Sequence, residues 1–284
     1  MTKSLDWFQT IKNLPSLPEQ INSVLVATGS TSSMDYNIVE IIQYDPSMAL
    51  SVLKVANSPV YGYSGKISSL QQAAGLLGPG TIKNIILRTP ILERHLTKRQ
   101  NDTPIDFSEL WVHCGATASL SGGLGRLIGG LESDVCFTAG LIHDAGIIAL
   151  SAYCPKELAK AFEISHNEKI CLLDAEKKVF GFNSSDVSVE LMSAWNFPDS
   201  LIDLFRSDDE DNKSSWVSKP IAVVVLAKLL LNEWGYPGCS HMQGEPDKEK
   251  LLQFLKITTD DLSNWEDELR KYVALAMRVL KGED

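Results

Sequence analysis

Helical spacing of the apolar residues is the feature that most constrains how this chain can fold. Apolar side chains recur three and four positions apart in nearly every segment, for example at Ile38, Val39, Ile41 and Ile42. This spacing places them on one face of an α-helix. The sequence shows no β-hairpin series, internal repeat or glycine-rich phosphate loop. It therefore predicts an all-α protein of 284 residues, long enough to bury a sizeable core.

Capping residues mark the helix ends in the first part of the chain. Asp45 is a natural N-cap and Pro46 suits the first helical position. Gly78 is expected to end a later helix, Thr81 to cap the next one, and Pro90 to break it. Each of these residues favours a boundary between short helices.

The second half begins after the polar stretch "TKRQNDTP", where Asp106 and Glu109 have capping-box spacing. We expect an N-terminal helical subdomain over residues 1–105. It is followed by a second subdomain over residues 106–284, which includes a C-terminal helical extension. "SDVCFTAGLIHDAGIIALSAYC" is expected to form one helix of this second half.

The longest apolar stretch runs from Ile221 to Leu231 and is interrupted by Lys228. It is too short to span a membrane, so we interpret it as a buried core helix, although "AVVV" alone would also fit a strand. "EWGYPGCSHMQGEPDKEK" is expected to be a long surface connection. The acidic run from Asp208 to Asp211 is typical of a solvated loop.

Charge and cysteine usage limit the environments and partners. The net charge is −10 and the pI is near 5.0, which disfavours general nucleic acid or anionic membrane binding. "LLGPGTIKNII" weakly resembles a helix-hairpin-helix, but in an acidic chain we interpret it as a tight turn between helices. The start "MTKSLDWFQT" has no apolar signal region. Five cysteines without a C-x-x-C pair suggest a reduced, cytoplasmic protein.

A histidine and an aspartate, His143 and Asp144, stand side by side in the apolar segment "LIHDAGIIAL". Buried polar groups need partners, so the pair either binds a metal or forms a hydrogen-bonded polar cluster. A metal wants about four ligands, and His113 in "LWVHC" is the best third candidate. Adjacent Cys114 gives little sign of a catalytic thiol. The remaining histidines lie in polar contexts typical of the surface: His95, His166 and His241.

Several motifs in order resemble one family. They are "LPSLP", "YDPSMALSVLKVANSPVYG", "ISSLQQAAGLLG", "LWVHC", "AGLIHDAGIIAL" and "VFGFNSSDVSVELMSAWNFPDSLI". Together they resemble the HDOD family, the HD-related output domains, over roughly residues 12–235. The resemblance implies an N-terminal helical bundle packed on an HD-like subdomain. It also implies a regulatory role in bacterial signalling, although the fold is similar to that of HD metal-dependent phosphohydrolases.

The resemblance places His113, His143 and Asp144 at metal-ligand positions of the HD fold. Other positions depart from the family pattern. Ser184 stands where a histidine is frequent, "FRSDDED" lacks the usual histidine pair, and Lys228 matches a late metal-binding aspartate. A protonated lysine cannot coordinate a metal. We therefore expect a vestigial site without a catalytic metal, and no cofactor; a divalent ion on the three surviving residues stays an alternative.

These departures predict a non-catalytic signal-transduction regulator that acts through protein–protein contacts. Its expected partners are signalling proteins: a sensor kinase, a response regulator or a cyclic-dinucleotide enzyme. A second copy of the chain is a further option, since the sequence leaves the oligomeric state open. The signal is expected to come from or pass to a separate protein, because no receiver, sensor or cyclase segment is evident. The alternative is a metal-dependent phosphohydrolase acting on a nucleotide or cyclic dinucleotide.

Overall fold

The computed structural model describes residues 38–86, 105–206, 218–236 and 247–281, with residues 11, 12, 14, 89 and 238. Within these ranges the chain is helical and contains no strand, as the apolar spacing predicts. The helices are α2 (Ile38–Ile42), α3 (Pro46–Ala56), α4 (Leu70–Ile86), α6 (Phe107–Ile128), α7 (Ser133–Ile142), α8 (Ala145–Tyr153), α9 (Pro155–Glu168), α10 (Leu172–Phe180), α11 (Ser184–Ala194), α12 (Asp199–Arg206), α13 (Lys219–Glu233), α14 (Lys248–Leu255) and α15 (Thr259–Lys281), with a short 3-10 turn, η2 (Pro59–Tyr61).

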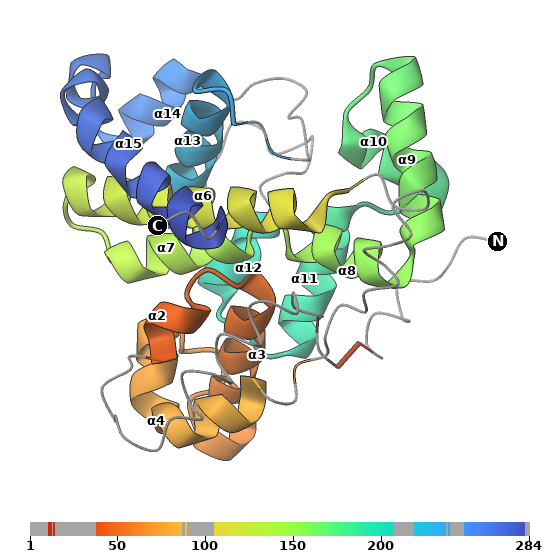
Figure 1. Ribbon diagram of the computed structural model, residues 1–284, viewed down its shortest axis with the longest axis vertical. Helices are drawn as coiled ribbons and strands as arrows, with labels where there is room; N and C mark the ends of the chain where they lie inside the picture. Colours follow the sequence, from red (N-terminus) through yellow and green to blue (C-terminus); the bar gives the residue numbers. More distant parts are fainter. Residues whose placement is uncertain are drawn as a thin grey trace.

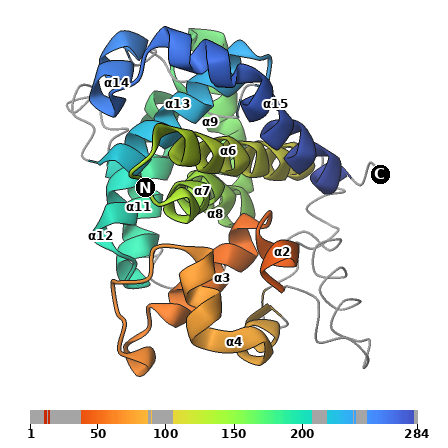
Figure 2. The same ribbon diagram turned by 90° about the vertical axis from the view of Figure 1, so that its left-hand side faces the viewer.

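The helices form three tiers, with α6 and α7 side by side in the middle (Figure 1). Helices α2 to α4 lie on one side of this pair, and α13 to α15 lie on the other (Figure 2). Helices α9 and α10 pack against each other at the edge of the molecule. The fold is thus the predicted one, an N-terminal helical bundle against a larger helical unit.

One buried core runs through the tiers, and two hydrogen bonds tie the N-terminal helices to the middle pair. Trp111 on α6 donates from Nε1 to Oδ2 of Asp45 at 3.1 Å. The backbone N of Leu70 donates to Oγ1 of Thr138 on α7 at 3.2 Å. Asp45 also accepts from the N of Met48 at 2.7 Å, so it caps α3 and joins the two halves.

The predicted caps are mostly confirmed. Asp45 and Pro46 begin α3, and Asp106 accepts from two backbone N–H groups of the first turn of α6. Gly78 separates two helical runs within α4, at φ 70° and ψ 161°. The prediction for Thr81 is wrong, because the second run already begins beside Pro79 and contains Thr81. Pro90 lies outside the described residues.

Two predicted segments need correction. The expected single helix over "SDVCFTAGLIHDAGIIALSAYC" is two helices, α7 and α8, broken at His143 and Asp144. The expected surface connection after Trp234 ends earlier than predicted, because Asp247 accepts from two backbone N–H groups and starts α14. The segment containing "AVVV" is helical, within α13.

The broken segment Ser133–Tyr153 is long and apolar enough, by length and composition, to cross a membrane. However, 83% of its most apolar window is buried inside the protein. The break at His143 also divides it into two short helices. These features are those of a core segment. The helix α13, for which the sequence predicts burial, is buried as well.

Removal of residues 1–105 is expected to leave a poorly soluble fragment. The loss would expose the apolar face of α7 and leave the side chains of Trp111 and Thr138 without their partners Asp45 and Leu70. Light scattering and thermal unfolding of residues 106–284, compared with the full chain, check this. A monomeric fragment that unfolds cooperatively would contradict a shared core.

Candidate metal centre

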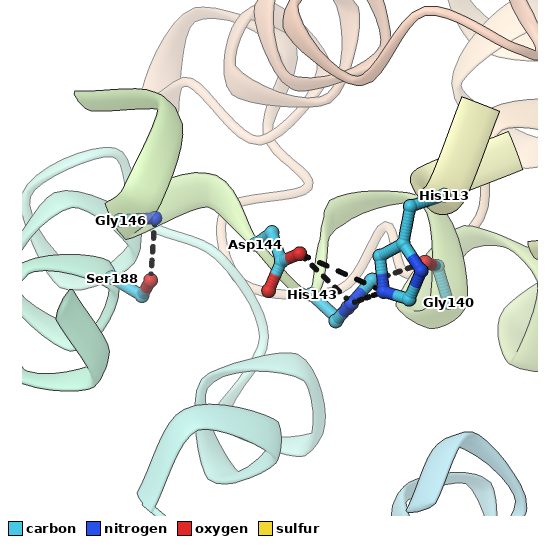
Figure 3. Close-up of polar contacts among 6 residues, drawn as sticks. All are labelled: His113, Gly140, His143, Asp144, Gly146 and Ser188. Carbon is cyan, nitrogen blue, oxygen red and sulfur yellow. Dashed lines mark hydrogen bonds and ion pairs between the residues drawn. The ribbon is translucent and has the colours of Figure 1, made fainter. Parts of the chain in front are cut away.

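Close packing of α6 against α7 brings the candidate residues together. A Cβ added at Gly140 would lie only 2.8 Å from the carbonyl oxygen of Thr117, so the two backbones nearly touch there. His113 lies one turn before Thr117 on α6, and His143 directly follows α7. As a result, Nε2 of His113 and Nε2 of His143 lie 3.2 Å apart (Figure 3).

Asp144 occupies the N-cap position of α8 but makes no capping hydrogen bond with its side chain. The first turn of α8 is satisfied from elsewhere, because the N–H of Gly146 donates to Oγ of Ser188 on α11 at 2.8 Å (Figure 3). The Asp144 carboxylate instead faces the histidines, with Oδ2 at 3.2 Å from Nε2 of His143 and 3.8 Å from Nε2 of His113. Ser188 thus frees this carboxylate for the cluster.

Gly146 is required by the close approach of α8 to α11. A Cβ at this position would lie 1.9 Å from the carbonyl oxygen of Ser184. No side chain fits such a space, so glycine allows the starts of both helices to meet. This contact fixes the turn that carries His143 and Asp144.

The hydrogen bonds of His143 define its tautomer. Nδ1 lies 2.8 Å from the carbonyl oxygen of Gly140, which can only accept, so Nδ1 carries the proton and donates. In the neutral imidazole, Nε2 then presents a lone pair to His113 and Asp144. Donation from Nε2 of His113 satisfies this lone pair, whereas Oδ2 of Asp144 has no hydrogen-bond partner. The neutral ring therefore offers no proton to Oδ2 across the 3.2 Å contact, whereas a protonated His143 would donate from Nε2 to it and form an ion pair.

All three residues are buried, with relative exposures of 8% for His113, 8% for His143 and 6% for Asp144. Burial lowers the pKa of His113 to about 3, with His143 and Lys228 acting in the same direction and Asp144 against it. Burial opposes ionisation of Asp144, but the charge and hydrogen bond that a protonated His143 supplies hold the pKa of that carboxyl below its ordinary value, and the charge of Lys228 acts in the same direction. At neutral pH the cluster therefore combines a neutral His113 with an ionised Asp144.

The three groups fit a divalent cation as a partial ligand set. One nitrogen from each imidazole and one carboxylate oxygen lie within 4.8 Å of one another. The Gly140 carbonyl orients His143 from behind, as outer partners of metal-bound histidines do. Oδ2 of Asp144 accepts no hydrogen bond, and a bound cation or a proton would satisfy this oxygen. These residues are the ones that would hold a metal.

The ligand set is incomplete, however, and the chain packs against one of its members. Among the described residues, no fourth His, Cys, Asp or Glu joins the group. The backbone at Gly238 lies against His113, since a Cβ there would lie 2.5 Å from Nε2 of that imidazole. The chain itself thus occupies the space beside one of the candidate ligand atoms.

The other sequence-predicted positions lie apart from the cluster. Ser184 begins α11, where its N–H donates to Oε2 of Glu176 at 2.6 Å. Lys228 lies half-buried on α13, a helix that packs against α6 and α7, and its charge acts on His113 and Asp144. His166 is exposed, as predicted. Three further predictions, for His95, His241 and the run Ser207 to Asp211, fall outside the described residues.

Glu176 is a functional candidate that the sequence prediction missed. It is fully buried on α10, and its Oε1 has no hydrogen-bond partner. Burial raises its pKa to about 7, and the charge of Asp144 adds to the rise. The signal was present, because Glu176 falls at helical spacing between Leu172 and Phe180 on an otherwise apolar face.

Comparison with known proteins gives a consistent result at the family level. The model of the HDOD domain matches residues 14–210 of the chain. No curated protein matches. The family match covers the candidate centre, and α13 and the helices after it lie beyond it.

Solved structures share the fold at low sequence identity. The MmoQ response regulator of Methylococcus capsulatus matches with a TM-score of 0.69 at 19% identity, covering 89% of this chain and 97% of that one. An HDOD domain protein of unknown function from Geobacter sulfurreducens has a TM-score of 0.55 at 20% identity, with coverages of 97% and 96%. A protein of Shewanella amazonensis, provisionally called a phosphohydrolase, matches with a TM-score of 0.53 at 19% identity, covering 98% of this chain and 96% of that one.

Burial of His113 and of Glu176 leads us to predict opposite effects of pH on the stability of the fold. His113, with its pKa lowered from 6.5 to about 3, stays neutral in the fold while the unfolded chain gains a proton, so stability falls as pH drops below about 6.5. Glu176, with its pKa raised from 4.5 to about 7, stays protonated in the fold while the unfolded chain ionises. Its contribution to stability is therefore lost as pH rises from about 4.5 to 7.

The variants Glu176→Gln and His113→Asn separate these contributions. Relative to the wild type, Glu176→Gln should gain stability as pH rises from about 4.5 to 7, and His113→Asn should gain it as pH falls from about 6.5. Each slope approaches about 1.4 kcal/mol per pH unit at most. Urea unfolding of chelator-treated protein between pH 4.5 and 8 measures this. Profiles that run parallel to the wild type would show that neither group titrates as described.

Proposed function

Because the chain belongs to the HDOD family, we propose that it is a non-catalytic bacterial signal-transduction regulator that acts through protein–protein contacts. The observation that carries this proposal is the burial of the candidate centre, where the backbone at Gly238 lies against Nε2 of His113. On this proposal the His113, His143 and Asp144 cluster is a residual metal site that performs no hydrolysis. It serves as a buried polar junction between α6, α7 and α8.

Burial of the centre argues against hydrolysis because a catalytic metal needs an open coordination position for water. The three residues are 6% to 8% exposed, and the described residues supply three ligands rather than a fuller set. A bound divalent metal would lower the pKa of a water ligand. The chain would then have to bring that water and a phosphate ester to buried atoms, one of which, Nε2 of His113, lies against the backbone at Gly238.

Charge supports the same proposal. Lys228 acts on both His113 and Asp144, and its ammonium repels a divalent cation that these residues would bind. It stands where the family resemblance places a metal-binding aspartate. The anionic ligand is thus replaced by a cation that partly neutralises Asp144.

The proposed partners are signalling proteins, namely a sensor kinase, a response regulator or a cyclic-dinucleotide enzyme, in the cytoplasm. The structurally similar MmoQ protein is called a response regulator, which supports a role in signalling. The net charge of −10 disfavours general nucleic acid or anionic membrane binding. A homo-oligomer is compatible with this role.

One observation favours the alternative, a metal-dependent phosphohydrolase that acts on a nucleotide or cyclic dinucleotide. Oδ2 of Asp144 is buried without a hydrogen-bond donor, and such an atom fits a cation ligand. His143 is held in the tautomer that presents Nε2 to the same point. Metal content and activity therefore decide between the two functions.

Asp144→Ala is expected to act on stability alone. The change removes an ionised carboxylate that the fold stabilises and leaves His143 without it, at a cost of about 1–3 kcal/mol. Wild-type protein purified without chelators should contain far less than one equivalent of manganese, iron, nickel or zinc. Neither protein should hydrolyse phosphodiesters or phosphomonoesters with added metal. Stoichiometric metal, with activity that a folded Asp144→Ala protein loses, would establish the phosphohydrolase instead.

Lys228→Gln is expected to strengthen divalent metal binding about tenfold, because it removes a cation that acts on two candidate ligands. Calorimetric titration with Mn²⁺ measures the affinity. Lys219→Gln, at the start of the same helix, is the matched control and should bind like the wild type. Equal affinities for the wild type and both variants would mean that Lys228 does not oppose a cation at this centre.

A further inference from the structure

We propose that the turn formed by residues 59–66, here called the docking turn, binds an acidic segment of a partner protein. Val60 and Tyr63 would make the apolar contacts, while Lys54 and Lys66 would contact carboxylates. The inference rests on the proposed function, for which it supplies the binding surface. It concerns a part of the molecule that the candidate metal centre does not use.

The docking turn presents apolar side chains to solvent. Val60 is 88% exposed and Tyr63 is 47% exposed, and Pro59, the first residue of η2, is exposed as well. Single exposed apolar residues are common on soluble proteins, but several within one short turn are typical of a contact site. In the arrangement of helices the turn follows α3, in the tier of α2 to α4 at one end of the molecule (Figure 2).

The turn is held rigidly from beneath. The side chain of Asn57 donates from Nδ2 to the carbonyl oxygen of Ile67 at 2.9 Å, and its Oδ1 accepts from the N–H of Ile67 at 3.0 Å and of Lys66 at 3.2 Å. The N–H of Gly65 donates to the carbonyl oxygen of Asn196, before α12, at 3.1 Å. These bonds fix the backbone at the end of the turn, which reduces the entropy lost when a partner binds.

The local charge indicates the chemistry of the partner. Residues 46–92 contain no aspartate or glutamate, although the whole chain carries a net charge of −10. The cations in this stretch are Lys54, Lys66, Lys83 and Arg88. Lys54 is held with its ammonium 4.4 Å from the ring centre of Trp195, and Lys66 is exposed at the end of the turn. A stretch that carries cations and no carboxylates, in an acidic protein, is complementary to an acidic partner.

The apolar tip favours a protein over a nucleic acid. Nucleic acid binding depends on several phosphate contacts, whereas the docking turn offers one lysine, Lys66, with Lys54 on the preceding helix α3. An acidic amphipathic segment satisfies both parts, with apolar side chains on the tip and carboxylates at the lysines. A second copy of this acidic chain is the nearest competitor and is distinguished by the test.

Photo-crosslinking tests the proposal with the full chain in cells of its source organism. p-Benzoylphenylalanine is placed at position 60, and at position 279 as a control, because Val279 on α15 is an equally apolar residue with 55% exposure. Position 60 is expected to crosslink to an acidic segment of a signalling protein, and position 279 is not. Mass spectrometry identifies the partner and the crosslinked segment, which is then made as a labelled peptide.

Fluorescence anisotropy with this peptide then measures the contribution of each residue. Val60→Asp and Lys66→Glu should each weaken binding at least tenfold, because they add negative charge beside an acidic segment. Val279→Asp should change it less than twofold. All three positions are exposed, so circular dichroism is expected to show unchanged folds.

Other outcomes would overturn the inference. These are a crosslink from position 60 to a second copy of the chain, to nucleic acid or to a basic segment, no crosslink at that position, or binding that Val60→Asp and Lys66→Glu leave unchanged. A signalling partner found only from position 279 would refute the docking turn and leave the proposed function standing. Absence of crosslinks at both positions, together with hydrolase activity, would refute both.

Discussion

The close approach of α6 and α7 at Gly140 is the constraint on which the candidate centre depends. Because the Gly140 backbone nearly touches the Thr117 carbonyl, His113 and His143 are brought to 3.2 Å of each other. The same carbonyl-bearing turn of α7 fixes the tautomer of His143. A larger residue at position 140 would separate the helices and disperse the cluster before any question of metal binding arose.

A second set of contacts decides what the cluster can do. Ser188 satisfies the start of α8, so Asp144 turns to the histidines rather than capping its own helix. Two other residues oppose the binding of a cation there. The backbone at Gly238 lies against Nε2 of His113, and Lys228 adds a positive charge. The outcome is a buried cluster that holds three candidate metal ligands beside a positive charge.

Most of the fold could be predicted from the sequence, because apolar spacing and caps such as Asp45 and Asp106 act over a few residues. The convergence of His113, His143 and Asp144 followed from the family resemblance. The break at Asp144 could not be read from spacing, since the apolar pattern continues through it and Ser188, distant in sequence, replaces the local cap. Gly238 depends likewise on a long-range contact that no local pattern records.

Nitrogen-15 NMR of the imidazoles, with Zn²⁺ added to the full chain, tests the central claim most directly. A covered polar cluster predicts a neutral His113 at pH 6, a His143 protonated on Nδ1, and ring nitrogen shifts that one equivalent of Zn²⁺ leaves unchanged. Loss of the free Nε2 signals of both histidines in step with added Zn²⁺ would show an accessible metal centre, and would contradict the regulatory account.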